Sequence, residues 1–150
     1  MAVDELLLQA ATAGQTTLRF YSWSCPTLSI GYFQAAQDRH QHVASRSCSL
    51  VRRASGGGAL LHHHELTYSF ATPASTRASR DQSRLYEGFH RSLVEILARH
   101  GVTADLCPES ASVPRPRPFL CFQRHTGGDV LIGQHKIAGS AQRRYRAALL

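Results

Sequence analysis

The chain has little that would place it in a membrane, a secretory pathway or a disulfide-rich class. It contains a single lysine, and no apolar run in it approaches the about 18 residues of a membrane span. Acidic Asp4 and Glu5 stand where a secretory signal would carry basic residues. We therefore expect a cytoplasmic protein with no membrane partner. No C-x-x-C pair occurs among the cysteines, which are expected as free thiols: Cys25, Cys48, Cys107 and Cys121.

The signatures of several ligand classes are also missing. The three glycines at 56–58 are not followed by the Gly-Lys-Ser/Thr of a P-loop, and they do not form a G-x-G-x-x-G dinucleotide fingerprint. The cluster His62-His63-His64-Glu65 lacks the H-E-x-x-H spacing of a helical zinc site. No metal is predicted, and His63 and His64 are interpreted as solvated side chains.

The composition predicts one positively charged globular domain. A hydrophobic content of 43% over 150 residues is enough for one core, so a single domain over residues 1–150 is expected. The net charge of +7 is compatible with nucleic acid, an anionic membrane surface or an acidic protein. Phe33, Tyr68 and Phe70 are expected in the core rather than on a base-stacking surface, which argues against nucleic acid.

Hydrophobic periodicity predicts two main helices, over 1–13 and 81–100, each followed by a glycine. A short helix is also expected within 37–45. The face expected to be buried in the first helix consists of Val3, Leu6, Leu7 and Ala10. The corresponding face of the second helix consists of Leu85, Phe89, Leu93, Ile96 and Leu97.

The remaining pattern predicts strands, and hence an α/β (α+β) fold with a mixed sheet flanked by helices. Prolines make 107–118 a loop, and the apolar end at 148–150 has no terminating signal, so we expect the natural chain to continue. The expected strands are 17–23, 27–31, 49–53, 58–62 and 65–71, followed by a hairpin of 129–132 with 136–141.

The triple glycine is the strongest candidate for a binding site. Adjacent glycines let backbone N–H groups approach a ligand closely, and Arg52, Arg53 and Ser55 add donors suited to a carbonyl or phosphate. His62 ends the strand that leaves this loop, and a substrate-facing role is predicted for it. A plain glycine-rich turn is the alternative interpretation.

Cys121 and Lys136 form a second candidate site. Cys121 lies where the proline-rich loop meets the sheet, whereas Cys25 and Cys48 are interpreted as small buried hydrophobes. Lys136 is the one lysine beside sixteen arginines, which suggests a position that needs an adjustable proton. An ammonium near a thiol favours the nucleophilic thiolate form. A buried, inert cysteine is the alternative.

Together these segments resemble the biotin/lipoate protein ligase catalytic-domain family, in its lipoate-protein ligase A and cysteine-dependent octanoyltransferase branch. The resemblance spans the chain from end to end, and its two most specific motifs are the glycine loop and the segment that begins at Lys136. The matching segments are MAVDELL at 1–7, WSCPTLSIG at 23–31, RRASGGGALLH at 52–62, ELTYS at 65–69, CF at 121–122, DVL at 129–131 and KIAGSAQRR at 136–144.

This resemblance implies a catalytic domain like those of biotin protein ligases and class II aminoacyl-tRNA synthetases. It implies that Cys121 takes octanoyl from acyl carrier protein as a thioester and passes it to a lysine of a lipoyl domain, in 2-oxoacid dehydrogenases or the glycine cleavage H protein. Lys136 would favour the thiolate, and no cofactor would be needed. The implied substrate-binding residues are Arg53, Ser55, Gly56, Gly57, Gly58, His62, Gly139, Ser140 and Ala141.

The resemblance also implies a partial domain, because relatives usually have a strand before the first helix and continue beyond the Arg143-Arg144 pair. His63 departs from the family, which commonly has an acidic residue there. Two alternatives remain open: an ATP-dependent lipoate-protein ligase that would use ATP and Mg, and a non-catalytic protein that only binds lipoyl domains or acyl groups.

Overall fold

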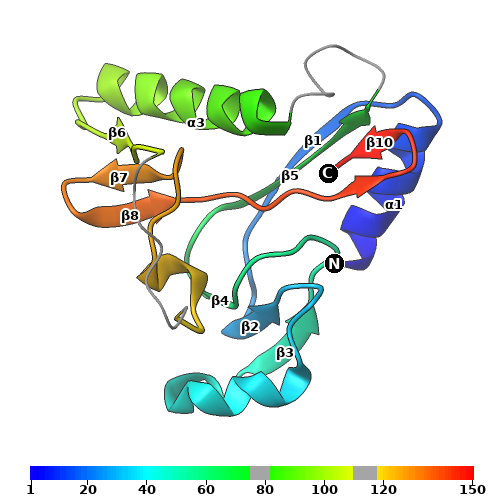
Figure 1. Ribbon diagram of the computed structural model, residues 1–150, viewed down its shortest axis with the longest axis vertical. Coiled ribbons are helices and arrows are strands. Elements are labelled where there is room, and N and C mark those ends of the chain that lie inside the picture. The colour runs from blue at the N-terminus through cyan, green and yellow to red at the C-terminus, as the bar shows by residue number, and fades with distance from the viewer. Residues whose placement is uncertain (75–81, 110–117) are drawn as a thin grey trace. The chain divides into compact units, whose positions relative to one another are not determined.

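Figure 1 presents the chain as a computed structural model, which describes residues 1–74, 82–109 and 118–150. Contacts divide the chain into two compact units. Unit 1 comprises Met1–Arg80, Phe119–Cys121 and Ala141–Leu150, and unit 2 comprises Asp81–Pro118 and Phe122–Ser140. The predicted α/β class is confirmed, with several sheets in place of one. The prediction of a single domain over 1–150 stays a prediction.

Unit 1 begins with helix α1 (Ala2–Thr12), which lies beside strand β10 (Figure 1). Leu8 and Ala11 pack on Ala71 and Ala148 in one buried cluster. The predicted helix is confirmed, but its predicted face is wrong: Val3 and Leu6 are exposed, and Leu7 packs only at the edge of the cluster. The true buried stripe lies one position further along because Asp4 also turns inward, where it accepts a hydrogen bond from Ser69 Oγ.

Helix α1 packs on a four-stranded antiparallel sheet with the order β1-β5-β10-β9. Its strands are β1 (Thr17–Tyr21), β5 (Thr67–Pro73), β10 (Ala148–Leu149) and β9 (Arg144–Tyr145). In β5 the small residues Ser69 and Ala71 face the core, whereas Tyr68 and Phe70 are only half-buried. A helix can approach a strand closely only where the side chains between them are small.

A second, three-stranded sheet in unit 1 is mixed. Central strand β2 (Thr27–Ile30) runs parallel to β3 (Ser49–Arg52) and antiparallel to β4 (Leu60–His62). Every residue of β2 is buried. The predicted short helix is confirmed as two 3-10 helices, η1 (Ala36–Gln41) and η2 (Val43–Ser45).

Unit 2 consists of helix α3 (Gln82–Arg99) and an antiparallel sheet with the order β6-β7-β8. The strands are β6 (Asp105–Leu106), β7 (Val130–Ile132) and β8 (His135–Ala138), and Gly133 makes the predicted hairpin turn with φ of 58°. Helix α3 ends before Gly101, as predicted, but Ile96 is exposed and His90 is its most deeply buried described side chain.

Two further expectations about burial are wrong. Phe33 is 89% exposed in the turn after β2, so it offers no argument against nucleic acid. Cys25 is exposed, in the bend that precedes Pro26 and strand β2, and Cys48 is half-buried. Most of the predicted proline-rich loop, residues 110–117, lies outside the described residues. No helix among the described residues is long and apolar enough to cross a membrane.

Leu149 tests the packing of the last strand. Its side chain is fully buried in β10, so Leu149→Ala should lower the free energy of unfolding by about 2–5 kcal/mol through lost burial and a residual cavity. Leu6→Ala is the matched control, because Leu6 is 62% exposed on α1 and its truncation should cost less than about 0.5 kcal/mol. Chemical denaturation measures both values, and equal losses would contradict the packing described.

Candidate functional site

The three glycines at 56–58 differ in why a glycine stands at each position. Gly57 has φ of 90°, and a Cβ on Gly31 at the end of β2 would lie 2.1 Å from the Gly57 carbonyl oxygen. A Cβ on Gly58 would lie 3.2 Å from the Phe119 carbonyl oxygen and 3.4 Å from Cys121 Cβ. Gly57 is therefore required by its left-handed backbone, and Gly58 by the close approach of the Phe119–Cys121 segment. Gly56 differs, because a Cβ there would meet only the Phe33 ring, at 3.9 Å.

Arg53 holds this loop from inside. Its Nη1 donates to the Ser29 carbonyl at 2.9 Å and to Ser29 Oγ at 2.7 Å, and its Nη2 donates to the Gly56 and Gly58 carbonyls at 3.1 and 2.7 Å. The side chain is only 8% exposed. Arg53 thus ties strand β2 to the glycine loop. The adjacent Arg52 instead donates to three carbonyls, those of Gly31, Tyr32 and Gln34.

His62 lies at the end of β4, as predicted, with its ring stacked on Trp23 at a centroid distance of 4.1 Å. Nδ1 contacts Glu65, and Nε2 lies 2.6 Å from Ser29 Oγ. Burial lowers the pKa of His62, against the opposing effect of Glu65, so the neutral ring is favoured. Its Nδ1–H then donates to the carboxylate, and Nε2 accepts from Ser29. The predicted substrate-facing role stays a prediction.

Cys121 opens the short 3-10 helix η3 (Cys121–Gln123), directly after a bridge between Ala59 and Leu120. The Cys121 N–H donates to the Ala59 carbonyl at 2.8 Å, and the Ala59 N–H donates to the Phe119 carbonyl at 3.0 Å. The backbone therefore brings the half-buried Cys121 to the glycine loop within unit 1. Cys107 belongs to unit 2, where burial raises the pKa of its thiol.

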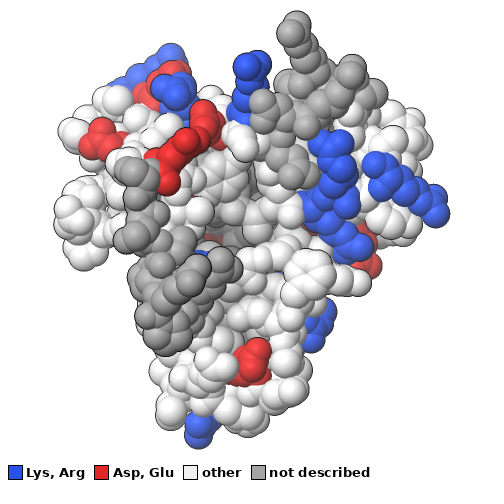
Figure 2. Space-filling view, viewed as in Figure 1, with Lys and Arg blue, Asp and Glu red and all other residues white. Residues whose placement is uncertain are grey.

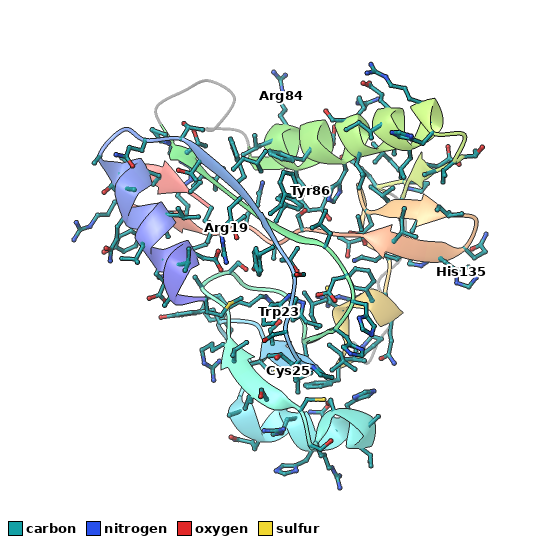
Figure 3. All side chains as sticks on the ribbon, turned by 180° about the vertical axis from the view of Figure 1, so that it is seen from behind. Arg19, Trp23, Cys25, Arg84, Tyr86 and His135 are labelled. Atoms are coloured by element: carbon teal, nitrogen blue, oxygen red, sulfur yellow. The ribbon has the colours of Figure 1, made fainter. Side chains whose placement is uncertain are left out.

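Lys136 lies in unit 2, in a buried ion pair. Its Nζ is 2.7 Å from Asp129 Oδ2, and both side chains are almost fully buried. Asp129 also accepts hydrogen bonds from the Tyr86 hydroxyl and the Thr126 N–H, both at 2.7 Å. Figure 3 shows Tyr86 and Arg84 on opposite sides of α3. The aspartate thus fixes the position of the Lys136 ammonium.

Gly139 and Ser140 complete this cluster. A Cβ on Gly139 would lie 2.5 Å from Lys136 Cε, so only glycine leaves room for the lysine side chain. Ser140 Oγ lies 2.8 Å from His90 Nε2, and His90 Nδ1 contacts the Gly128 carbonyl. Since a carbonyl only accepts, Nδ1 carries the hydrogen and the neutral Nε2 accepts from Ser140. Burial lowers the pKa of His90, which agrees with a neutral ring.

The predicted site residues thus fall into two groups. Unit 1 contains Arg53, Ser55, Gly56, Gly57, Gly58, His62, Cys121 and Ala141. Unit 2 contains Lys136, Gly139 and Ser140. Their functional roles stay predictions, as does the pairing of Cys121 with Lys136. Among the described residues, no group of three or more His, Cys, Asp or Glu side chains could hold a metal ion.

The sequence analysis missed four polar residues of these groups, which are Ser29, Tyr86, His90 and Asp129. Tyr86 and His90 are four residues apart on one helix, and this spacing puts both on one face. That spacing was a usable signal. No sequence signal distinguishes Ser29 from its apolar neighbours in β2.

These features define a mixed α/β protein with a thiol held against a glycine loop. Residues 1–150 match the family model of the lipoyl protein ligase A/B catalytic domain. The chain belongs to this family, and the resemblance seen in the sequence is confirmed.

Curated relatives include proteins named octanoyltransferase LipM. The one from Oceanobacillus iheyensis is 36% identical over 155 residues, which cover 100% of this chain and 56% of the relative. The one from Staphylococcus aureus is 36% identical over 163 residues, covering 100% of this chain and 58% of the relative. The chain thus spans little more than half the length of these relatives.

Among solved structures, lipoate-protein ligase A bound with ATP is similar with a TM-score of 0.74 and 23% sequence identity. The match covers 99% of this chain and 57% of that one. At this identity the likeness supports the fold alone. LipL1 of P. falciparum in complex with lipoate has a TM-score of 0.63 and 14% identity, with 97% of this chain and 41% of that chain covered.

The glycines can be ranked by how much their replacement with alanine should destabilise the protein. Gly57→Ala should lower the free energy of unfolding by about 1–2 kcal/mol because its φ is left-handed. Gly31→Ala should cost more, because a Cβ would overlap a backbone oxygen. Gly56→Ala is the control and should stay within about 0.5 kcal/mol of the parent. Denaturant titration gives the order, and a Gly56 variant as unstable as the other two would contradict it.

His90 should make stability depend on pH. Burial holds its pKa below the ordinary value of 6.5, so the unfolded chain takes up the proton first. This contribution is complete above pH 6.5 and is lost as pH falls below 6.5, with a slope of at most about 1.4 kcal/mol per pH unit. His90→Gln should flatten the fall between pH 6.5 and 5 in the unfolding free energy. The exposed His135, replaced by Gln, should leave the slope unchanged.

Proposed function

We propose that this chain carries the acyl-transfer site of an octanoyltransferase in lipoate biosynthesis, with Cys121 as the nucleophile. The observation that carries the proposal is the attachment of Cys121 to the glycine loop through the Ala59 backbone. Relatives named octanoyltransferase match the chain over its whole length, which supports the reaction class. The assignment of the reaction to Cys121 rests on the family motif and on this geometry.

The proposed reaction has two steps. The Cys121 thiolate attacks the carbonyl carbon of octanoyl bound as a thioester to acyl carrier protein; a new C–S bond forms, and the carrier leaves as a thiolate. The carrier sulfur takes up a proton equivalent to the one that Cys121 lost. The amine of a lysine on a lipoyl domain then attacks the Cys121 thioester, so an amide forms and the cysteine is released as a thiol after proton transfer.

Gly56 and Lys136 have a place in this scheme. Gly56 leaves one side of the loop open next to Phe33, so a backbone-lined surface is available to the thioester carbonyl and the start of the acyl chain. Donors aimed at the developing oxyanion would supply the main catalytic stabilisation. Lys136 is proposed as the proton carrier, and its buried ion pair with Asp129 at 2.7 Å holds it in place. No cofactor is required for these steps.

The proposed partners are octanoyl-acyl carrier protein and the lipoyl domains of 2-oxoacid dehydrogenases or the glycine cleavage H protein, in the cytoplasm. Acyl carrier proteins and lipoyl domains are acidic, and the net charge of +7 would speed their encounter with this chain. Figure 2 shows Lys and Arg side chains at several places on the viewed face, with acidic and uncharged residues among them. This distribution suits steering of an acidic partner more than one tight docking patch.

Mass spectrometry of an acyl-enzyme tests the proposal. The purified protein, incubated with octanoyl-acyl carrier protein, should gain one octanoyl group on the peptide that contains Cys121, and Cys121→Ser should abolish this adduct. Cys25→Ser is the matched control, because it removes an exposed free thiol of the same unit and should leave the adduct intact.

The alternatives give different outcomes in the same assay. An adduct that survives Cys121→Ser would contradict the nucleophile. Acyl transfer that needs ATP and Mg and survives this substitution would instead identify an ATP-dependent lipoate-protein ligase. Lipoyl-domain binding without any adduct would favour the non-catalytic reading.

A further inference from the structure

Arg53 is a buried cation without a carboxylate partner. Its four hydrogen bonds go to three carbonyls and one hydroxyl, and its buried Nε has no hydrogen-bond partner in the part of the chain that the structure describes. Among the described residues, no carboxylate lies within ion-pair distance of its guanidinium. Neutral acceptors satisfy the N–H groups but leave the charge itself uncompensated.

The other strongly buried cation shows the contrast. In unit 2, Lys136 is 3% exposed and contacts the Asp129 carboxylate at 2.7 Å, so that pair is neutral overall. In unit 1, even the half-exposed Arg19 has Asp4 at 3.5 Å. A protein seldom buries a charge without a counter-charge, because desolvation costs several kcal/mol per ion. Arg53 therefore marks a position where a negative charge is expected for at least part of the reaction.

Cys121 lies next to that position. Gly58 connects the two: its carbonyl accepts from Arg53 Nη2 at 2.7 Å, and a Cβ built on it would lie 3.4 Å from Cys121 Cβ. Both residues belong to unit 1. The Arg53 guanidinium and the Cys121 side chain thus both lie next to Gly58.

The titratable neighbours of Arg53 leave few candidates for the missing anion. Burial is the main reason that the pKa of Arg53 is lowered, and Cys121 and Tyr21 act in the opposite direction. Burial raises the pKa of the Tyr21 phenol above 10.0, so it is neutral at physiological pH. Burial lowers the pKa of His62, whose neutral ring carries no negative charge, and Glu65 is on the far side of that ring. Of these groups, Cys121 is the one that can become an anion beside Arg53.

We infer that Arg53 is a positioning residue that holds Cys121 as a thiolate by serving as its buried counter-charge, while its four hydrogen bonds fix the glycine loop against it. The inference rests on the proposed function, in which Cys121 reacts as a thiolate. It adds a second cation to the Cys121 and Lys136 pair predicted from the sequence. Lys136 already shares its charge with Asp129, whereas the charge of Arg53 is available to the sulfur.

Alkylation of Cys121 by iodoacetamide tests this without any acyl substrate, because only the thiolate reacts. The rate of modification of the Cys121 peptide is followed by mass spectrometry from about pH 5.5 to about pH 9. This range covers the pH values at which protein thiols ionise. Cys25, exposed in the same unit, is the internal reference in every sample. In the parent protein, Cys121 should reach its plateau rate at a lower pH than Cys25.

Two substitutions separate charge from shape. Arg53→Gln should lower the rate of Cys121 alkylation at neutral pH by about tenfold and move its pH profile to higher pH, with no change at Cys25. Arg53→Lys keeps a cation but not the forked hydrogen bonds, so its profile should lie closer to the parent than that of Arg53→Gln. The matched control is Arg39→Gln, which also removes a guanidinium that donates to three carbonyls in unit 1, those of Ser45, Arg46 and Cys48. It should leave the profile of Cys121 unchanged.

A folded Arg53→Gln protein with the parental Cys121 profile would overturn the inference, and so would Arg53→Lys shifting the profile as far as Arg53→Gln. Circular dichroism establishes folding. If the glutamine variant does not fold, the measurement on the parent protein still tests the inference. Identical pH profiles of the alkylation rate for Cys121 and Cys25 would overturn it. The proposed function is tested separately, because the octanoyl adduct on the parent protein can form whether or not Arg53 supplies the charge.

Discussion

The glycine loop depends on one buried guanidinium. The Arg53 side chain donates to main-chain carbonyls of strand β2 and of the loop. It supplies the stabilising contacts that residues 56–58 cannot make, because they have no side chains. A glycine segment loses more conformational entropy on folding than any other, and without such a brace it would be mobile. The same hydrogen bonds fix the position of Gly58. They thereby fix the place where the Phe119–Cys121 segment pairs with the backbone of Ala59.

The two units differ in how a buried cation is compensated. In unit 2, Asp129 accepts from a lysine, a tyrosine and a backbone N–H, so the buried lysine has a carboxylate as its counter-charge. In unit 1, the charge of Arg53 stays uncompensated while its N–H groups are almost all satisfied. The first arrangement is rigid and neutral, and the second attracts an anion. A nucleophilic thiol needs the second arrangement at the sulfur.

Much of the fold was accessible from the sequence, and the reason is local. Helix α1, helix α3 and the β7–β8 hairpin were predicted nearly to their ends, because periodicity, glycine caps and a tight turn are encoded within a few residues. Burial was harder to predict. Val3 and Leu6 are exposed while Asp4 is buried, since which face of a helix is covered depends on partners far along the chain. Phe33 and Cys25 were misplaced because each lies in a turn or bend beside a strand, outside the periodic pattern that predicts burial.

The candidate site also has features that were predictable from the sequence and features that were not. The sequence by itself determined the membership of the family, the glycine loop, and the candidates Cys121 and Lys136, because these are motifs of residue type and spacing. Only the tertiary structure decided that Gly57 needs a left-handed backbone, that Gly58 serves packing and that Gly56 stays open. It also decided that Asp129 pairs with Lys136, and that Arg53 has no carboxylate partner among the described residues. A residue's type states which charge it can carry, but its counter-charge is supplied by chain segments that only folding brings together.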